Sequence, residues 1–538
     1  MASTDRVCLL AIVGLAGGLR VWGIDFGLPH TLARPDEDAT VAIALRFFSR
    51  QFNPGFFDWP SLFMYIVTVA FIVYFQIGRV TGRFPYEVTF LAEAGKSQAP
   101  LRFITRGLSA AAGVITVGAV HAIGLRLFDR TTALIGALFL AVAALHVRDS
   151  HFGVTDVAAT CWVTLSFLFT VKYAQSGRRR DAIVSAILAG LAASTKYNAG
   201  LVVLPGLWAI AIGSPGWRSR GALATIYVTV AIVAFFCGTP YALIDRPAFL
   251  AALGGISARF QGGHAALAGP GWVVHLSSSL RYGMGLPLVG AGILGLALFI
   301  WSDRRYGVLF AVFPLAYYAF IGAGETAFAR YIIPVVPFLC LSAAHAIVQA
   351  AGLVGRLTGR AQMIPAAAWT LAIAAATPSL VAAAWTDLLL ARTDNRLIAA
   401  DWIRRTYPDG VSIAQTGTVA GQVQMTTAAD PDAAATYRPL KFEPGSGRFF
   451  LPDDSDGSPE LILVEECPLP YCRIPDEWFT VLRRGYHIER VFPAYDTTSQ
   501  TPTYDRDDDF YLPLSGFNAV LRPGPNITVY GRNLHGAP

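Results

Sequence analysis

The sequence predicts an all-α membrane domain of roughly 11–13 transmembrane helices, followed by a small α+β domain. Only 14% of the residues are charged, whereas a soluble domain usually carries about 25%. Runs of about twenty apolar residues recur up to about residue 386, and a helix of that length crosses the hydrocarbon core of a bilayer. From Arg392 onward Asp, Pro, Gly and Thr become common and the long apolar runs stop. We therefore assign residues 1–390 to the membrane domain and 391–538 to an extracytoplasmic soluble domain.

Apolar runs of spanning length mark the candidate membrane segments. They cover residues 7–24, 61–78, 103–125, 131–147, 155–174, 182–195, 197–213, 222–238, 283–301, 306–322, 328–350 and 364–385. In the tail, one amphipathic helix over 393–410 and short strands at SIAQTG, LILVEEC and HIERVFPAY indicate a small α+β module.

Basic residues in the short loops predict the topology, because such residues are retained in the cytoplasm. The run 178–180, Arg-Arg-Arg, is the firmest cytoplasmic anchor. Counting forward from it places the turn at Lys196 and the tail outside. When the crossings are counted backward from the same anchor, the loops fall on their expected sides only if the run 61–78 does not cross the membrane. We therefore expect this run to be re-entrant or interfacial. This gives eleven crossings, and thirteen is the other odd count that works.

The net charge of +6 is explained by this topology signal, so we expect no nucleic-acid partner. The sequence has no GxxxxGK[ST] phosphate loop and no GxGxxG after a strand, which leaves soluble nucleotide chemistry unsupported.

Cys467 and Cys472 stand five apart in the polar tail, a spacing that closes a small disulfide loop if the tail faces an oxidising compartment.

The first predicted outside loop carries an acidic triplet at 36–38, Asp-Glu-Asp. It follows Pro35, which suits a helix start, and carboxylates are favoured in the first turn by the helix dipole. Capping alone would explain the triplet equally well. Its place just beyond a span, and a second acidic position at Asp58 in the same loop, favour a functional site.

The second outside loop, HVRDSHFGVTDVA, packs five polar side chains into eleven residues between two spans: His146, Arg148, Asp149, His151 and Asp156. An ionisable group at a span end that faces other such groups is a functional candidate. Lys196, followed by Tyr197, interrupts a long apolar stretch at an outer turn. It either reaches the headgroups as a snorkelling side chain or belongs to the same site.

Arg106 and Arg330 lie near outer span ends in this topology. A carboxylate acts as general base on an acceptor hydroxyl, and cations at the bilayer surface hold a lipid-linked phosphate and stabilise it as a leaving group. The combination indicates an enzyme whose donor substrate is linked to a lipid.

At these residues the sequence resembles the GT-C glycosyltransferases, in the branch of protein O-mannosyltransferases and lipid A aminoarabinose transferases. The resemblance covers roughly residues 15–350. Its motifs, in family order, are PDED at 35–38, FFDWPSL at 56–62, RxxSAxxG at 106–113, SHFGVTD at 150–156, GLAASTKYNAG at 190–200 and RYIIPVVPF at 330–338. The resemblance implies a GT-C type membrane domain and a polyprenyl-phosphate-linked sugar donor.

The resemblance also implies catalytic positions. Asp36 matches the first-loop acidic residue taken as the catalytic base, with Glu37 beside it, and Asp156 matches the second-loop Asp that organises the site. The implied reaction is a single inverting displacement at the anomeric carbon that releases polyprenyl phosphate. It requires no cofactor. These carboxylates could bind a divalent metal, but their spacing does not demand one, and we assign no metal.

The donor phosphate is expected near four further residues by the same resemblance: Lys196, Arg106, Arg330 and His151, the last standing where mannosyltransferases carry an Arg. At 58–60 the sequence Asp-Trp-Pro departs from the family, which has His-Pro-Pro in one branch and Glu-Lys-Pro in the other. We therefore assign Asp58 and Tyr197 to the acceptor or to shaping the site, and leave the acceptor class open among protein, lipid and polysaccharide.

Two other functions stay open. A flippase for the lipid-linked sugar would show inverted repeats and charges in the middle of spans, whereas here the charges cluster at one face. A catalytically silent scaffold subunit is the other alternative. The alanine-rich composition favours a bacterial inner membrane, with undecaprenyl or decaprenyl phosphate as carrier.

Overall fold

The computed structural model describes residues 3–213, 216–263, 269–408, 410–425, 437–443, 448–450, 456–474, 476–496 and 501–533. The chain divides into two compact units. The helical unit comprises Met1–Trp22, Thr40–Phe71 and Ile104–Trp385. The sheet unit comprises Gly23–Ala39, Ile72–Phe103 and Thr386–Pro538. One division between the units falls between Trp385 and Thr386, close to the predicted boundary after residue 390. The sheet unit also takes two segments from the N-terminal part of the chain, which the composition did not indicate.

The helical unit is built from long α-helices joined by short helical turns. Its helices are α1 (Ser3–Val21), α5 (Ala99–Leu127), α6 (Arg130–Val142), α7 (Ala144–Ser150), α8 (Thr155–Ser176), α9 (Arg179–Thr195), α10 (Val203–Gly213), α11 (Trp217–Gly238), α12 (Tyr241–Ile244), α13 (Arg246–Gly262), α14 (Gly271–Val274), α15 (Arg281–Met284), α16 (Leu286–Ser302), α17 (Arg304–Gly322), α18 (Val336–Thr358) and α19 (Ile364–Leu390). The turns are η1 (Tyr197–Val202), the π-helical η2 (His275–Leu280), η3 (Ala329–Val335) and η4 (Ala361–Met363). Four of the described helices contribute residues to both units, namely α2 (Pro35–Phe48), α3 (Leu62–Val80), α5 and α19, and α4 (Glu87–Lys96) belongs to the sheet unit.

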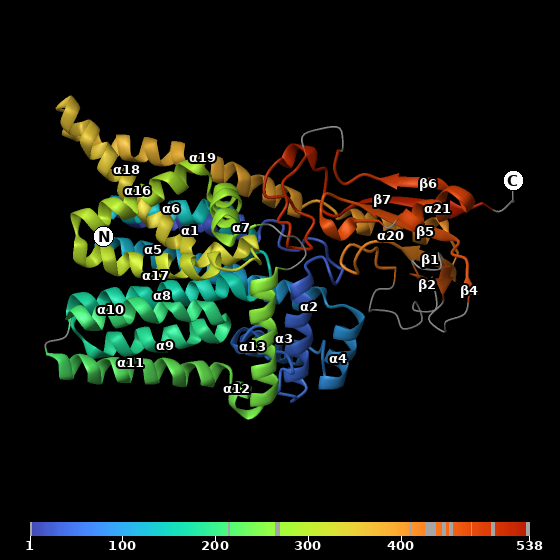
Figure 1. Ribbon diagram of the computed structural model, residues 1–538, viewed down its shortest axis with the longest axis horizontal. Coiled ribbons are helices and arrows are strands. Elements are labelled where there is room, and N and C mark those ends of the chain that lie inside the picture. The colour runs from blue at the N-terminus through green and yellow to red at the C-terminus, as the bar shows by residue number, and fades with distance from the viewer. Residues whose placement is uncertain are drawn as a thin grey trace. The chain divides into compact units, whose positions relative to one another are not determined.

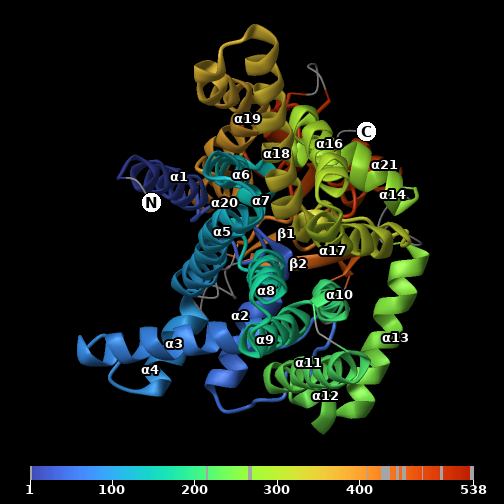
Figure 2. The same cartoon turned by 90° about the vertical axis from the view of Figure 1, so that its left-hand side faces the viewer.

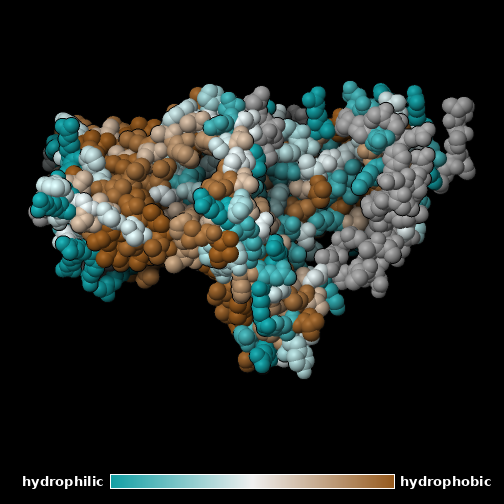
Figure 3. Space-filling model, turned by 60° about the horizontal axis from the view of Figure 1, so that its bottom comes forward, coloured by the Kyte–Doolittle hydropathy of each residue, from teal (hydrophilic) through white to brown (hydrophobic). Residues whose placement is uncertain are grey.

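Each apolar run that was expected to cross is helical, although the runs 131–147, 197–213 and 328–350 are each divided between two helical elements. The long helices run along one another in Figure 1. Among the described residues, seven helices are long and apolar enough to cross a membrane, or up to nine if two bent pairs are counted as spans. The segment Tyr197–Gly213 is apolar but shorter, and α9 begins with Arg179, Arg180 and Asp181. A broad hydrophobic surface covers the helices (Figure 3), as expected where lipid replaces water.

Two helices depart from this common direction. In Figure 2, α3 and α13 run in the plane of the view, whereas α8 and α10 point toward the viewer. Helix α13 has no buried residue, which suits a helix lying at a surface. Length and composition alone count α3 among the possible spans, with a mean hydropathy of 1.7. The interfacial placement of 61–78 therefore stays a prediction, and the direction of α3 favours it.

The sheet unit contains a seven-stranded mixed sheet in the order β4-β3-β2-β1-β5-β7-β6. The strands are β1 (Val411–Gln415), β2 (Tyr437–Glu443), β3 (Arg448–Phe450), β4 (Asp456–Gly457), β5 (Leu461–Glu466), β6 (Tyr486–Phe492) and β7 (Asn526–Arg532). Strand β1 pairs in parallel with β2 and β5, and the outer pairs are antiparallel. The predicted α+β class and the three predicted strands are confirmed.

Alternation along β5 explains why helices cover both faces of the sheet. Leu461 and Leu463 pack in one apolar cluster with α20 (Asn395–Thr406), whereas Ile462 and Val464 pack in another with α21 (Asp476–Gly485). Successive side chains of a strand point to opposite faces, so a strand covered on both sides is apolar throughout. The possible disulfide is present in the structure and joins Cys467 to Cys472, with a Cα–Cα distance of 5.5 Å.

A buried polar cluster lies beside β5. Arg396 donates to Asp394 through Nε (2.9 Å) and Nη2 (2.7 Å). Glu465 is also buried, and neither of its carboxyl oxygens has a hydrogen-bond partner within the described part of the chain. Burial raises the pKa of Glu465 well above its ordinary value, an effect that the guanidinium of Arg396 opposes but does not cancel. The carboxyl group of Glu465 therefore keeps its proton to a higher pH than an exposed glutamate does.

This protonation gives a testable prediction about stability. The folded state keeps a proton on Glu465, whereas the unfolded chain releases this proton above a pH of about 4.3. The contribution of Glu465 to the free energy of unfolding therefore falls as the pH rises from about 4.3 toward the pKa of Glu465 in the folded state. In this range the free energy of unfolding falls by about 1.4 kcal/mol per pH unit. We expect Glu465→Gln to raise the unfolding midpoint of the full-length protein at pH 8 and to change it little near pH 4.5. The control is Glu466→Gln at the exposed neighbour. An equal midpoint for wild type and Glu465→Gln at pH 8 would contradict the assignment.

Candidate active site

Asp156, Lys196 and Arg330 come together in the helical unit from three different elements. Asp156 occupies the first turn of α8 and is only 4% exposed. Lys196 directly follows α9, whose last turn it closes by donating its backbone N–H to the carbonyl of Ala192 at 2.9 Å. Arg330 lies in η3. Since the chain leaves a helix at Lys196 and enters one at Asp156, both side chains lie at helix ends, where the backbone direction changes.

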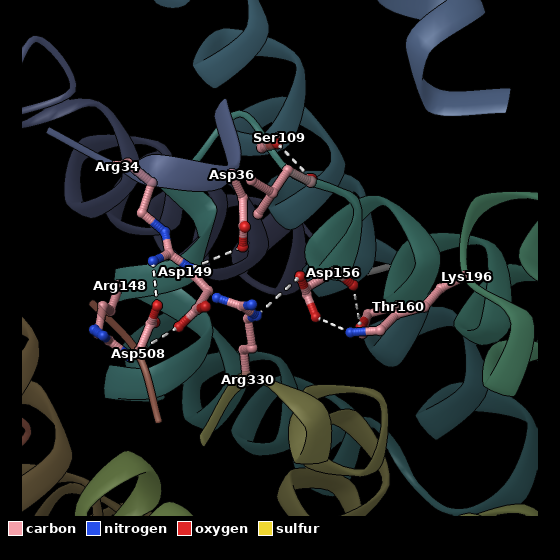
Figure 4. A network of polar contacts seen from close by, with 11 residues as sticks. Arg34, Asp36, Ser109, Arg148, Asp149, Asp156, Thr160, Lys196, Arg330 and Asp508 are labelled. Atoms are coloured by element: carbon pink, nitrogen blue, oxygen red, sulfur yellow. Dashed lines mark hydrogen bonds and ion pairs between the residues drawn. The ribbon is translucent and has the colours of Figure 1, made fainter. Parts of the chain in front are cut away.

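The carboxylate of Asp156 binds both cations (Figure 4). The ammonium of Lys196 pairs with Oδ1, and Arg330 Nε lies 4.0 Å from Oδ2. Aromatic rings support each cation: Lys196 Nζ lies 4.5 Å from the ring centre of Tyr331, and the guanidinium of Arg330 lies 4.3 Å from that of Phe328. The carboxylate thus holds two cations close together, and cations placed in this way can bind an anionic ligand.

The predicted second outside loop is not a solvated loop. Its polar residues His146, Arg148, Asp149, His151 and Asp156 are all buried. Four of them precede α8, on or directly after the short helix α7, which bends by 57° from α6. In a membrane domain, a broken helix is tolerated where the freed backbone groups find partners.

Those partners are side chains from distant segments. Arg20 on α1 donates to the carbonyls of Leu140 and Ala141, at 3.1 and 3.0 Å, in the last turn of α6. The hydroxyl of Ser379 on α19 donates to the carbonyl of Val142 at 3.0 Å. Arg20 also contacts Nδ1 of His146 at 2.9 Å. The bend that carries the second loop into the interior is therefore held by α1 and α19.

His151 contacts two backbone carbonyls. Its Nδ1 and Nε2 lie 3.0 Å from the carbonyl oxygens of Val147 and Trp22. Burial lowers the pKa of His151 to about 4, an effect that the hydrogen bonds to these two carbonyls oppose. The predicted contact of His151 with the donor phosphate stays a prediction.

Arg106 is fully buried in α5, and its turn packs directly against the second loop. A Cβ on Gly153 would overlap the side chain of Thr105 and would lie 3.4 Å from the backbone nitrogen of Arg106. Gly153 in SHFGVTD is therefore required by this close approach. The predicted role of Arg106 at the phosphate stays a prediction.

The two residues assigned to the acceptor, Asp58 and Tyr197, are neighbours. The hydroxyl of Tyr197 donates to the carbonyl of Phe57 at 3.0 Å, immediately before Asp58. Asp58 pairs with Arg259 of α13 at 2.8 Å, and both side chains are about half exposed. Phe249 of α13 packs on both Phe57 and Tyr197. The loop 56–60 is thus tied to α13 on one side and to the turn after Lys196 on the other.

The acidic triplet begins α2, as predicted, and two arginines lie beside its three carboxylates. Arg102 Nη2 donates to Asp38 at 3.0 Å, and its Nη1 lies 3.9 Å from Glu37. Arg34 Nη2 lies 3.6 Å from Asp36. Glu37 is fully buried, whereas the side chains of Asp36 and Asp38 are 28% and 48% exposed. Exposure and a neighbouring cation therefore do not distinguish Asp36 from Asp38, and the role of Asp36 as the base stays a prediction.

Arg34 anchors this loop within the sheet unit. Its Nη1 donates to Asp508 at 2.5 Å, and its guanidinium lies 5.3 Å from the ring centre of Phe510 (Figure 4). His30 and Thr31 add contacts to the segment 422–424. Sequence reasoning missed both Arg34 and Asp508. The available signals were an Arg immediately before the acidic triplet and the acidic run DRDDD at 505–509.

The described residues contain no group of three or more His, Cys, Asp or Glu side chains arranged to hold a metal ion. Asp36 and Glu37 have arginine neighbours, and Asp156 accepts from two cations. The expectation that no metal or other cofactor is required remains untested.

The pairing at Asp156 gives a second testable prediction. Asp156→Asn removes the carboxylate that Lys196 and Arg330 share, and removing one partner of a buried pair typically costs about 3–5 kcal/mol. We expect the unfolding midpoint of the purified protein to fall for Asp156→Asn and to recover in part when Lys196→Gln is added. The double-mutant cycle should give a coupling free energy of about 1 kcal/mol or more. Asp58→Asn, which breaks a more exposed pair, is the matched control, and additive effects at 156 and 196 would disprove the pairing.

Comparison with known proteins agrees with this architecture. No curated protein matches the sequence. Residues 89–243 match the family model of dolichyl-phosphate-mannose-protein mannosyltransferases, a segment that includes Arg106, Asp156 and Lys196. The crystal structure of ArnT from Cupriavidus metallidurans bound to undecaprenyl phosphate aligns over 100% of both chains, with a TM-score of 0.54 and 15% identity.

The crystal structure of the Archaeoglobus fulgidus oligosaccharyltransferase in its apo form aligns over 81% of this chain, with a TM-score of 0.51 and 13% identity. This chain spans 64% of the length of that enzyme. At identities this low, the similarity to solved structures shows the fold alone. The family model adds a similarity in sequence over residues 89–243. The chain therefore shares its fold with ArnT and with the archaeal oligosaccharyltransferase.

Proposed function

We propose that the chain is an integral membrane glycosyltransferase that takes a sugar from a polyprenyl-phosphate-linked donor and joins it to an acceptor hydroxyl. The observation that carries the proposal is the group formed by Asp156, Lys196 and Arg330, a buried carboxylate that holds two cations side by side. Such a group is arranged for a phosphate, whose oxygens accept from both cations at once.

The names of the similar proteins support this donor class. The matching family model is named for dolichyl-phosphate-mannose, and ArnT was crystallised with undecaprenyl phosphate. Both are polyprenyl phosphates. A second structure of the archaeal oligosaccharyltransferase, with a TM-score of 0.50, holds a tethered acceptor peptide. The acceptor of this chain stays open, because the loop at Asp58 departs from the relatives' pattern.

In the proposed reaction the acceptor oxygen attacks the anomeric carbon while the bond from that carbon to the phosphate oxygen breaks. The acceptor proton passes to the carboxylate of Asp36, and polyprenyl phosphate leaves with the bonding electron pair. Lys196 and Arg330 stabilise the negative charge that develops on the leaving phosphate. A single displacement of this kind inverts the anomeric configuration. Asp156 acts as a positioning residue, since its oxygens are engaged by the two cations.

We also propose that this chemistry takes place on the extracytoplasmic face of a bacterial inner membrane. Helix α8 carries Asp156 in its first turn and ends at Ser176, directly before the basic run 178–180. Twenty residues of α-helix span about 30 Å, which is the thickness of a hydrocarbon core. If the basic run is cytoplasmic, Asp156 lies at the opposite face.

The first experiment measures sugar release from a panel of radiolabelled polyprenyl-phosphate sugars by the purified protein. We expect one donor to be turned over by the wild type. Asp36→Asn should lower turnover by about 100-fold to 10,000-fold, because a positioned general base contributes that factor. Asp38→Asn is the matched control, since it removes the more exposed carboxylate of the same triplet.

Two outcomes would contradict the proposal. Equal turnover by wild type and Asp36→Asn would exclude Asp36 as the base. Tight binding of one donor without turnover by either protein would favour a flippase or a silent subunit.

Arg34 gives a further prediction, as the residue that positions Asp36. Arg34→Gln removes the cation that lies between Asp36 and Asp508. We expect kcat to fall about tenfold, with the KM for the donor nearly unchanged, because the donor cations are elsewhere in the chain. Arg34→Lys should restore part of kcat. If Arg34 only stabilised the fold, Arg34→Gln would lower the amount of folded protein, and the folded fraction would keep the kcat and the KM of the wild type.

A further inference from the structure

A second basic site lies at the end of α8 opposite to Asp156. A cavity of about 440 Å³ opens there between the end of α5, the end of α8 and the start of α9. The residues lining it are Arg126, Phe169, Lys172, Gln175, Ser176, Arg178, Arg180, Asp181 and Val184. Its volume lies within the range of about 300–1,000 Å³ that is usual for small-ligand sites.

The cavity carries a strong positive charge. Four of its lining residues are cations, namely Arg126, Lys172, Arg178 and Arg180, against one carboxylate. That carboxylate, Asp181, lies 3.8 Å from Arg180 Nε, so three cations remain in excess. The positive-inside rule explains basic residues in a cytoplasmic loop, but it does not require them to line one cavity.

The walls of the cavity are fixed by contacts of their own. Arg126 on α5 donates to the amide oxygen of Gln175 on α8 at 3.2 Å, and Gln175 donates back to the carbonyl of Arg126 at 2.7 Å. Lys172 lies over the ring of Phe169, 4.0 Å from its centre. In these contacts neither Arg126 nor Lys172 forms an ion pair with a carboxylate. The side chains that line the cavity are therefore held in place without a ligand.

Apolar side chains continue from the cavity along the lipid-facing surface. Leu125 stands next to Arg126, and Ile183 and Ile187 lie on α9 beyond Asp181; all three are exposed. Figure 3 shows hydrophilic side chains at the left end of the helices, directly beside the hydrophobic surface. A ligand held here has a charged part at the helix ends and an apolar part along them.

From this arrangement we propose that the cavity binds the phosphate headgroup of an anionic membrane lipid in the cytoplasmic leaflet, with the acyl chains along α5 and α9. A diacyl lipid with an anionic phosphodiester, such as phosphatidylglycerol, carries a charge opposite in sign to that of the cavity, and its acyl chains suit the apolar path. The site is separate from the donor site, because the two lie at opposite ends of α8. The proposal does not depend on the proposed glycosyl transfer.

Lipid binding to the full-length protein in neutral detergent tests this site, with phosphatidylglycerol and phosphatidylcholine titrated separately and bound lipid counted by native mass spectrometry. We expect phosphatidylglycerol to bind at least tenfold more tightly. Lys172→Gln combined with Arg178→Gln should weaken that binding by about tenfold to thirtyfold, since each basic residue near the surface contributes about a factor of five. Arg304→Gln combined with Arg305→Gln removes two cations from another predicted cytoplasmic loop and should change binding less than twofold.

Three outcomes would overturn the proposal. They are equal binding of the two lipids, equal loss in both double variants, and full competition by glycerol phosphate at concentrations similar to the lipid. The last would assign the cavity to a soluble phosphate. Arg178→Gln alone, at an exposed residue, keeps the test valid if the double variant does not fold, and should weaken binding about fivefold.

Discussion

The interaction on which the helical unit depends is the pairing of Asp156 with Lys196 and Arg330. A charge removed from water is stable in an apolar interior only if it is paired and hydrogen-bonded. Asp156 and Lys196 are 40 residues apart, and Arg330 comes much later in the chain. Their pairing therefore determines which helix ends must meet: the start of α8, the end of α9 and the turn η3. The same requirement explains the aromatic rings beside both cations, which shield the pairs from water.

A related constraint acts on the backbone. The bend between α6 and α7 breaks the hydrogen-bond ladder of a helix inside the membrane domain, and the freed carbonyls need donors. Arg20 and Ser379 supply them from α1 and α19. The bend brings the second loop into the interior, so that its polar residues face one another instead of water. Ion pairing and backbone satisfaction thus act together in building the site.

The sequence predicted most of this at the level of elements. Apolar length located the helices, and short apolar segments in the polar tail located three of the strands. The motifs located Asp156, Lys196 and Arg330, but a sequence does not reveal which charge pairs with which. The sequence did not reveal that the bend between α6 and α7 buries His151 beside two backbone carbonyls. Arg34 was missed because its partner lies 474 residues further along the chain.

That last distance has a consequence for how the protein is made. The segment 23–39 lies in the sheet unit, and Asp508 is a partner of Arg34 there. At about 5–20 residues per second, the ribosome needs roughly 25 to 95 s to add the intervening residues. During this time Arg34 lacks its contact with Asp508 although most of the helices have already been synthesised. A chain that stops before Asp508 would contain every helix from α1 to α21 and still lack this contact, so the first loop reaches its final contacts only when synthesis is almost complete.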